Sequence, residues 1–390
     1  MRQRPESAFG RLMHAFGPLT KDPKLGDVPF NTSVTLEKLP TRGILNASTD
    51  ANVIHKLDPE TLRVTDRYDF SYFSPELDKS MCLSHGTLDD VTGEYFNCMA
   101  NYSPVKTEYT VFRIDSSGKA NVLAKVKDFT YYMHSLALTK SYVIMAMGPA
   151  QIDLFPLLRG KSFTEACEMR PNTPTRFVVI NRQSGGIVAE YEHEQFFNFH
   201  TFNAFEQDGD IMIDRSLFSD CKILQELWID NMTQGGNVAR VKPVRFTLPN
   251  IADVGARYST SMPKASFRVL ADVALEFATV SPRKRERPYH YVFGVSDNDG
   301  KQFSSSIAKV NVDTGIVTSY VLPQRTFGEP IFVPDPSGNE EDAGCLVVLA
   351  LDDLKDSSAL LVLDARAMTE VARAELPMRL PPSFHGAFHT

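Results

Sequence analysis

The stretch NFHTFNAFE, residues 198–206, is the point from which the rest of the chain can be interpreted. It places His200 within an apolar, aromatic run of the kind that forms a buried β-strand. An acidic turn with a glycine follows at 206–210, and a second apolar strand at 211–214. The pattern predicts a β-hairpin with a histidine on its inner strand.

Three more of the nine histidines have similar apolar neighbours, whereas the other five lie in charged turns, in polar strands or near the chain ends. A histidine in an apolar strand is more often a core residue bonded to a backbone carbonyl than a metal ligand. Four such histidines weaken that interpretation, although the residues alone leave both open. We expect the four to meet and hold a metal: His85, His134, His200 and His385.

Composition limits the class of protein. The chain has 390 residues, 43% of them hydrophobic, and a net charge of −7, so we expect a large core and no nucleic-acid partner. Its five cysteines form no Cys-x-x-Cys pair, which argues against a disulfide framework and a structural zinc site. Apolar runs are too short for a membrane span, and the start has no apolar signal region. A cytoplasmic protein is therefore expected.

Short apolar runs alternate with Gly, Asp, Asn and Pro turns almost throughout, which favours an all-β fold. A degenerate repeat also recurs: an apolar strand, then Asp or Asn, a short turn and another strand. Repeats of this kind predict the blades of a β-propeller, in which distant histidines can meet on one axis. Unrelated hairpins in a sandwich are the alternative. The repeat occurs around residues 58, 115, 181, 313 and 364.

Other enzyme classes lack support in the sequence. It contains no Gly-x-Gly-x-x-Gly, no phosphate-binding glycine loop, no Gly-x-Ser-x-Gly and no His-Glu-x-x-His. We therefore expect no nucleotide cofactor and no serine-hydrolase chemistry.

Residues 151–163 depart from the β pattern. Bulky apolar residues are followed directly by the basic Arg159 and Lys161. The segment is compatible with a buried loop, with the lip of an apolar tunnel, or with a membrane-surface patch. We expect peripheral membrane contact here, through Ile152, Leu154, Phe155, Leu157 and Leu158.

Several ordered motifs resemble the carotenoid cleavage oxygenase family. The resemblance extends from about Phe9 to the end of the chain, so its motifs are specific as a set. They lie at residues 49–62, 132–139, 197–206, 328–334 and 384–388.

The resemblance implies one domain over residues 1–390: a seven-bladed β-propeller with an axial metal site and a cap of loops and helices over one face. It implies a non-haem Fe(II) bound by the four histidines named above, and oxidative cleavage of a conjugated double bond in an apolar polyene by dioxygen, giving carbonyl products. Neutral imidazoles suit Fe(II), and four of them leave coordination positions for dioxygen.

The family also has three carboxylates that accept a proton from ligand imidazoles and so fix the orientation of the rings. The matching positions are Asp50, Glu276 and Glu329. Many members have glutamate where this chain has Asp50, and aspartate is one methylene shorter. We therefore expect Asp50 to reach its histidine through a water molecule or not at all.

Two further differences bear on activity. Stilbenoid-cleaving members have a lysine at the position of Thr49, so we expect a carotenoid or apocarotenoid substrate, with stilbenoid cleavage as the alternative. Members usually have a longer region before residues 7–10. We therefore expect a propeller incomplete at its N-terminus and less stable, and an inactive propeller that acts as a binding scaffold is a third interpretation.

Overall fold

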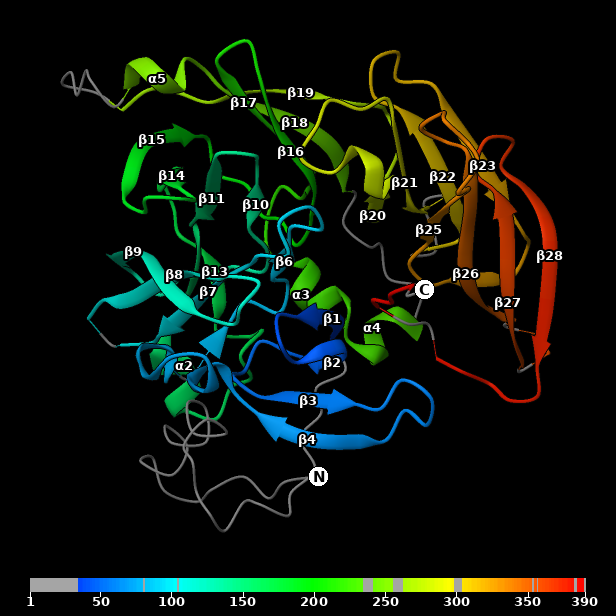
Figure 1. The fold of residues 1–390 in the computed structure, drawn as a ribbon, viewed down its shortest axis with the longest axis horizontal. Helices are drawn as coiled ribbons and strands as arrows, with labels where there is room; N and C mark the ends of the chain where they lie inside the picture. Colours follow the sequence, from blue (N-terminus) through cyan, green and yellow to red (C-terminus); the bar gives the residue numbers. More distant parts are fainter. Residues whose placement is uncertain are drawn as a thin grey trace. The chain divides into compact units, whose positions relative to one another are not determined.

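The computed structural model describes residues 34–388 except residues 80, 104, 234–240, 255–261, 298–303, 353, 356 and 382–383 (Figure 1). The chain packs as two compact units. The first consists of the residues up to Leu136 together with Ser141–Gln195, and the second of Ala137–Lys140 together with the residues from Phe196 onward. A single domain over residues 1–390 stays a prediction.

Three antiparallel sheets make up most of the first unit. In the first sheet β1 (Thr35–Leu39), β2 (Gly43–Ser48), β3 (Ile54–Leu57) and β4 (Val64–Tyr68) pair in sequence order (Figure 1). The second contains β5 (Met81–Cys82), β6 (Thr87–Leu88), β7 (Tyr95–Asn101), β8 (Thr107–Ile114) and β9 (Ala120–Asp128). In the third, β11 (Tyr142–Met147), β14 (Thr175–Asn181) and β15 (Ile187–His193) pair consecutively. Smaller elements are β12 (Ala150–Ile152), β13 (Cys167–Met169), α2 (Leu154–Leu158), η2 (Phe70–Tyr72) and η3 (Pro75–Leu77).

The second unit also contains three antiparallel sheets. The first is β16 (Thr201–Gln207), β17 (Asp210–Leu217), β18 (Lys242–Leu248) and β19 (Ser266–Val269). The next is β20 (Glu276–Val280), β21 (Tyr291–Ser296), β22 (Ser306–Asn311) and β23 (Val317–Val321). The last is β24 (Arg325–Phe327), β26 (Gly344–Asp352), β27 (Ser357–Asp364) and β28 (Thr369–Leu376), with β25 (Ile331–Pro334) also on β26. Smaller elements are β10 (Ala137–Leu138), α3 (Ile223–Glu226), α4 (Ile229–Thr233), α5 (Ile251–Val254) and η4 (Pro282–Lys284).

The prediction of an all-β fold is confirmed. Three of the six larger sheets among the described residues pair their strands in strict sequence order, and the other three follow the chain along the sheet but pass over short strands, as between β5 and β7, β11 and β14, and β24 and β26. This antiparallel order is typical of the blades of a β-propeller rather than of the Greek keys of a sandwich. A seventh blade and a cap over one face stay predictions. The N-terminal region around residues 7–10, where we expected an incomplete propeller, lies outside the described residues.

The repeat seen in the sequence marks the same hairpin in five of these sheets. In each, the side-chain oxygen of Asp or Asn accepts a hydrogen bond from a backbone N–H two or three residues later, which closes an Asx turn between two consecutive strands. The pairs are Asp58 with Thr61, Asp115 with Ser117, Asn181 with Gln183, Asn311 with Asp313, and Asp364 with Arg366.

Burial within each sheet falls towards its last strand. In the second sheet of the first unit, β7 is buried on both faces along nearly its whole length. By contrast, β4 and β28 are the last strands of their sheets and are mostly exposed. Their polar residues, including Arg373 paired with Glu370 in β28, suit an edge that must not pair with another chain. The core therefore lies around the central strands.

One buried carboxyl group makes the stability of the first unit depend on pH. Both carboxylate oxygens of Glu37 in β1 are shielded from solvent. Burial raises the pKa of Glu37 from 4.5 to about 7, and the nearby hydroxyls of Ser48 and Tyr95 lower it only in part. Since the folded state holds this proton more tightly than the unfolded state, stability present below pH 4.5 is lost as the pH rises through about 7.

Glu37→Gln removes this ionisation. We expect the variant to match the wild type near pH 4.5 and to be more stable at pH 8, by about 1–3 kcal/mol. Urea denaturation at several pH values measures the difference. A difference between the two proteins that is the same at every pH would contradict the prediction.

Candidate metal centre

The four predicted histidines form two pairs, one within each unit. In the first unit the rings of His85 and His134 have centroids 4.6 Å apart. A ring nitrogen of each lies within 4.8 Å of one from the other. His85 forms an isolated parallel bridge with Ser135, so the two backbone segments run side by side. This pairing brings together two loops that are separate in sequence.

A glycine beside His85 allows this approach. A Cβ added to Gly86 would lie 1.9 Å from the hydroxyl oxygen of Tyr95, a distance that no side chain tolerates. Tyr95 is fully buried, and its hydroxyl accepts a hydrogen bond of 2.9 Å from the amide of Asn97. Because the tyrosine is fixed, residue 86 must be glycine for the chain to carry His85 past it.

Three oxygens surround Nδ1 of His134. The Tyr132 hydroxyl is the nearest at 3.0 Å, the Ser84 hydroxyl lies at 3.4 Å, and an Asp50 carboxylate oxygen lies at 4.0 Å. The last distance is too long for a hydrogen bond. Burial raises the pKa of Asp50, and hydrogen bonds from the hydroxyl and backbone N–H of Ser84 lower it. The structure therefore ties Asp50 to Ser84 rather than to the histidine.

The second unit holds the other pair. The sequence predicts His200 within the inner strand, whereas in the structure that strand, β16, begins one residue later, at Thr201. The ring centroid of His200 is 4.9 Å from that of His385. Nδ1 of His200 is 2.6 Å from Oε2 of Glu276, and Nδ1 of His385 is 3.2 Å from Oε1 of Glu329. The backbone N–H of Gly386 donates to the other Glu329 oxygen at 3.1 Å. Both predicted glutamates thus contact the predicted histidines.

A β-bulge aims Glu276 and its neighbour at this pair. The pairing of β20 with β21 changes register between Glu276 and Thr279, and Phe277 has a φ of 47°. Bulges of this kind redirect side chains beside functional sites. The Phe277 ring lies 5.3 Å from the centroids of both His200 and His385. This role of Phe277 could not be predicted from the sequence, because neighbouring residues of a regular strand point to opposite faces.

The environment of His200 favours a neutral imidazole. Burial lowers the pKa of His200 to about 3; nearby His385 lowers it further, whereas Glu329 raises it. Burial raises the pKa of Glu276 to about 8, opposed by the Phe277 N–H and by His385. An imidazole that donates Nδ1–H to a carboxylate presents the lone pair of Nε2 to a metal. The residues of each pair therefore fit a divalent transition-metal ion.

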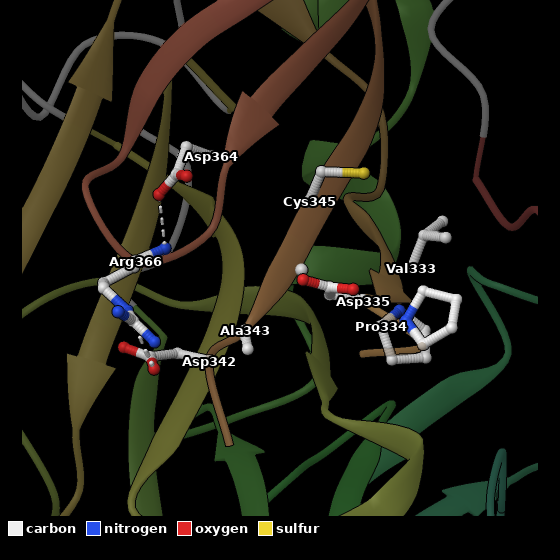
Figure 2. Close-up of a pocket in the computed structure, with 10 residues that line it drawn as sticks. Val333, Pro334, Asp335, Asp342, Ala343, Cys345, Asp364 and Arg366 are labelled. Carbon is white, nitrogen blue, oxygen red and sulfur yellow. Dashed lines mark hydrogen bonds and ion pairs between the residues drawn. The ribbon is translucent and has the colours of Figure 1, made fainter. Parts of the chain in front are cut away.

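Two cavities differ in their relation to these residues. A cavity of about 300 Å³ in the first unit borders Asp50 and Tyr132, with walls that are mainly apolar and aromatic. A cavity of about 530 Å³ in the second unit has a charged wall, where Arg366 meets Asp364 and Asp342 (Figure 2). Its acidic Asp342 is also bonded to Lys309 at 2.7 Å. None of the four histidines lines this larger cavity.

The residues of the expected membrane patch have different environments. Asp153 is the N-cap of the α2 helix, and its carboxylate accepts a hydrogen bond from the backbone N–H of Phe155. Ile152 and Leu157 are buried, whereas Phe155 is 57% exposed and lies under the guanidinium of Arg159. The side chains of Leu154 and Leu158 lie outside what the structure describes. Among the described residues no helix is long and apolar enough to cross a membrane.

Replacing Glu276 by glutamine tests the role of the carboxylate. Glu276→Gln should lower the affinity for Co(II) by about 10–100-fold, because the carboxylate no longer orients the His200 ring. The fold should persist, since the shapes of the two side chains match. Titration of metal-free protein measures the affinity, with Glu168→Gln in β13, an exposed position, as the control. Equal affinity in both variants would show that Glu276 does not orient a ligand.

Two known proteins are similar in sequence to most of this chain. A carotenoid dioxygenase from Neurospora crassa is 31% identical over 379 residues, which cover 87% of this chain and 61% of that protein. A torulene dioxygenase from Fusarium fujikuroi is 28% identical and covers 88% of this chain and 65% of its own length. The chain thus spans less than two thirds of these two relatives.

Among solved structures, that of cobalt-substituted Synechocystis apocarotenoid oxygenase matches 91% of this chain and 74% of its own, with a TM-score of 0.77 and 23% identity. At this identity the likeness concerns the fold alone. Residues 2–390 match the family described as retinal pigment epithelial membrane protein. The chain therefore belongs to this family, that of the carotenoid cleavage oxygenases.

Proposed function

We propose that the two histidine pairs together bind one Fe(II), and that the protein uses dioxygen to cleave a conjugated double bond of a carotenoid or apocarotenoid into two carbonyl products. The observation that carries the proposal is the position of oxygen atoms beside the Nδ1 atoms of three of the histidines. Those of His134, His200 and His385 each lie within 3.2 Å of an oxygen from their own unit. Each of these three rings is thereby oriented to offer Nε2.

Bound iron would supply the electrons that make dioxygen reactive towards a double bond. The residues of the chain have simpler tasks. Glu276 and Glu329 would accept the Nδ1–H of His200 and His385, which sets the tautomer and the plane of each ring. The Phe277 ring lies 5.3 Å from both histidine rings, where its apolar surface would limit the access of water.

The apolar polyene is proposed as substrate because of the cavity beside Asp50. Its lining includes Thr49, Tyr102, Met133 and Phe163, and none of its lining residues carries a positive charge. Such walls suit an apolar chain better than a phenolate, which favours a carotenoid over a stilbenoid. The names of the two fungal relatives support the same substrate class.

Iron content and product analysis test the proposal. We expect the purified protein to hold close to one iron per chain and to convert an apocarotenal into two shorter carbonyl compounds, labelled when the gas is ¹⁸O₂. His200→Ala should lose iron and activity. His193→Ala, at the end of β15, is the matched control and should keep both.

The alternatives give different results in the same assay. Cleavage of resveratrol with no cleavage of apocarotenals would assign the protein to stilbenoids. Absence of iron with the fold intact would favour a binding scaffold. Full activity in His200→Ala would exclude the proposed metal centre.

We also propose peripheral membrane contact through α2, where the apolar substrate dissolves. Phe155 and Arg159 would meet the headgroup region, the phenyl ring in the apolar boundary and the guanidinium on phosphate. Phe155→Asp should reduce sedimentation with anionic liposomes several-fold. Leu62→Asp, at a residue 67% exposed in another turn, is the control. Binding that is reduced equally in both variants, or in neither, would exclude this contact.

A further inference from the structure

The group that faces Nδ1 of His134 differs from the groups that face Nδ1 of the histidines in the second unit. His200 and His385 each face a glutamate carboxylate at Nδ1, at 2.6 and 3.2 Å. His134 instead faces the phenolic oxygen of Tyr132 at 3.0 Å, with the Asp50 carboxylate at 4.0 Å. Of these three oxygens, that of the tyrosine lies at ordinary hydrogen-bond distance, whereas that of Ser84 at 3.4 Å is marginal.

We propose that Tyr132 is the positioning residue of His134: its hydroxyl oxygen accepts the Nδ1–H that Asp50 is one methylene too short to reach. The inference rests on the proposed function, in which His134 binds the metal through Nε2. It concerns the orientation of the imidazole and gives Tyr132 no part in the reaction itself.

Local structure holds Tyr132 in place for this task. Tyr132 and His134 are two residues apart in an extended segment, so their side chains point to the same side. Their rings stack with centroids 6.0 Å apart and planes 17° from parallel. The Tyr132 N–H donates to the carbonyl of Ala150 at 2.8 Å, and its ring contacts Phe163. The backbone hydrogen bond and the two ring contacts therefore hold the tyrosine in place.

A phenol in place of a carboxylate changes the strength of the hydrogen bond at Nδ1 of His134. The oxygen of a phenol has lone pairs that can accept a hydrogen bond, and the Tyr132 oxygen lies 3.0 Å from Nδ1 of His134. Asp50 is meanwhile hydrogen bonded by Ser84. A neutral phenol draws the Nδ1 proton less strongly than a carboxylate does, so His134 is expected to be the weaker electron donor to the metal.

The test compares the Co(II) affinity of the metal-free full-length chain and three variants. Tyr132→Phe keeps the ring and its stacking but removes the oxygen, and it should lower the affinity about tenfold or more. Tyr131→Phe makes the same change at the neighbouring residue and should match the wild type. Tyr132→Phe combined with Asp50→Glu supplies a carboxylate one methylene longer and should regain most of the lost affinity.

A second measurement separates positioning from a general structural effect. In the Co(II) protein the Nδ1–H protons of ligand histidines give shifted NMR signals that exchange with solvent. In Tyr132→Phe the His134 signal should exchange much faster, while those of His200 and His385 persist. Thermal unfolding should change little, because a single hydroxyl is removed and the ring packing stays.

The outcomes distinguish this inference from the proposed function. Wild-type protein that binds no Co(II) would refute the proposed metal centre, and the inference with it. Wild-type protein that binds Co(II), with Tyr132→Phe equal to it in affinity and in proton exchange, would refute the inference alone. The same holds if the Asp50→Glu change fails to restore affinity in the tyrosine variant.

Discussion

The hydrogen bond between Nδ1 of His200 and Glu276 is the interaction on which the proposed centre most depends. At 2.6 Å it joins a buried imidazole to a buried carboxyl group, neither of which is easily accommodated alone in an apolar interior. The bulge that brings Glu276 to this point leaves Phe277 with a φ of 47°, a conformation that costs about 1–3 kcal/mol for a residue of this kind. The strain is retained because the same turn of the backbone directs a carboxylate and a phenyl ring to two histidines.

Much of this arrangement could be predicted from the sequence, but for two different reasons. The all-β architecture followed from physical patterns: short apolar runs and the Asx turns at residues such as Asp115 and Asn181. Glu276 and Glu329 were identified through the family motifs. No local pattern marks an acidic residue that contacts a histidine from a different strand, so such pairings emerge only from tertiary structure.

Three positions show where reasoning from sequence stops. Tyr132 and Phe277 resemble ordinary aromatic core residues, and only the distances to His134 and His200 distinguish them. The sequence pattern predicts a surface patch that includes Ile152, Phe155 and Leu157, yet the side chains of Ile152 and Leu157 are buried. Hydrophobicity cannot tell a side chain that faces lipid from one that faces the core, because both are apolar environments.

The pairing of the histidines within each unit also has a consequence for biosynthesis. His85 and His134 come from neighbouring parts of the chain, so their segments can meet while later blades are still on the ribosome. His200 and His385 are separated by nearly half of the sequence, and His385 follows the last strand, β28. The second pair therefore cannot form until translation has passed residue 385. Metal captured before that point would have three of the four histidines available at most, so tight retention would distinguish a finished polypeptide from a nascent one.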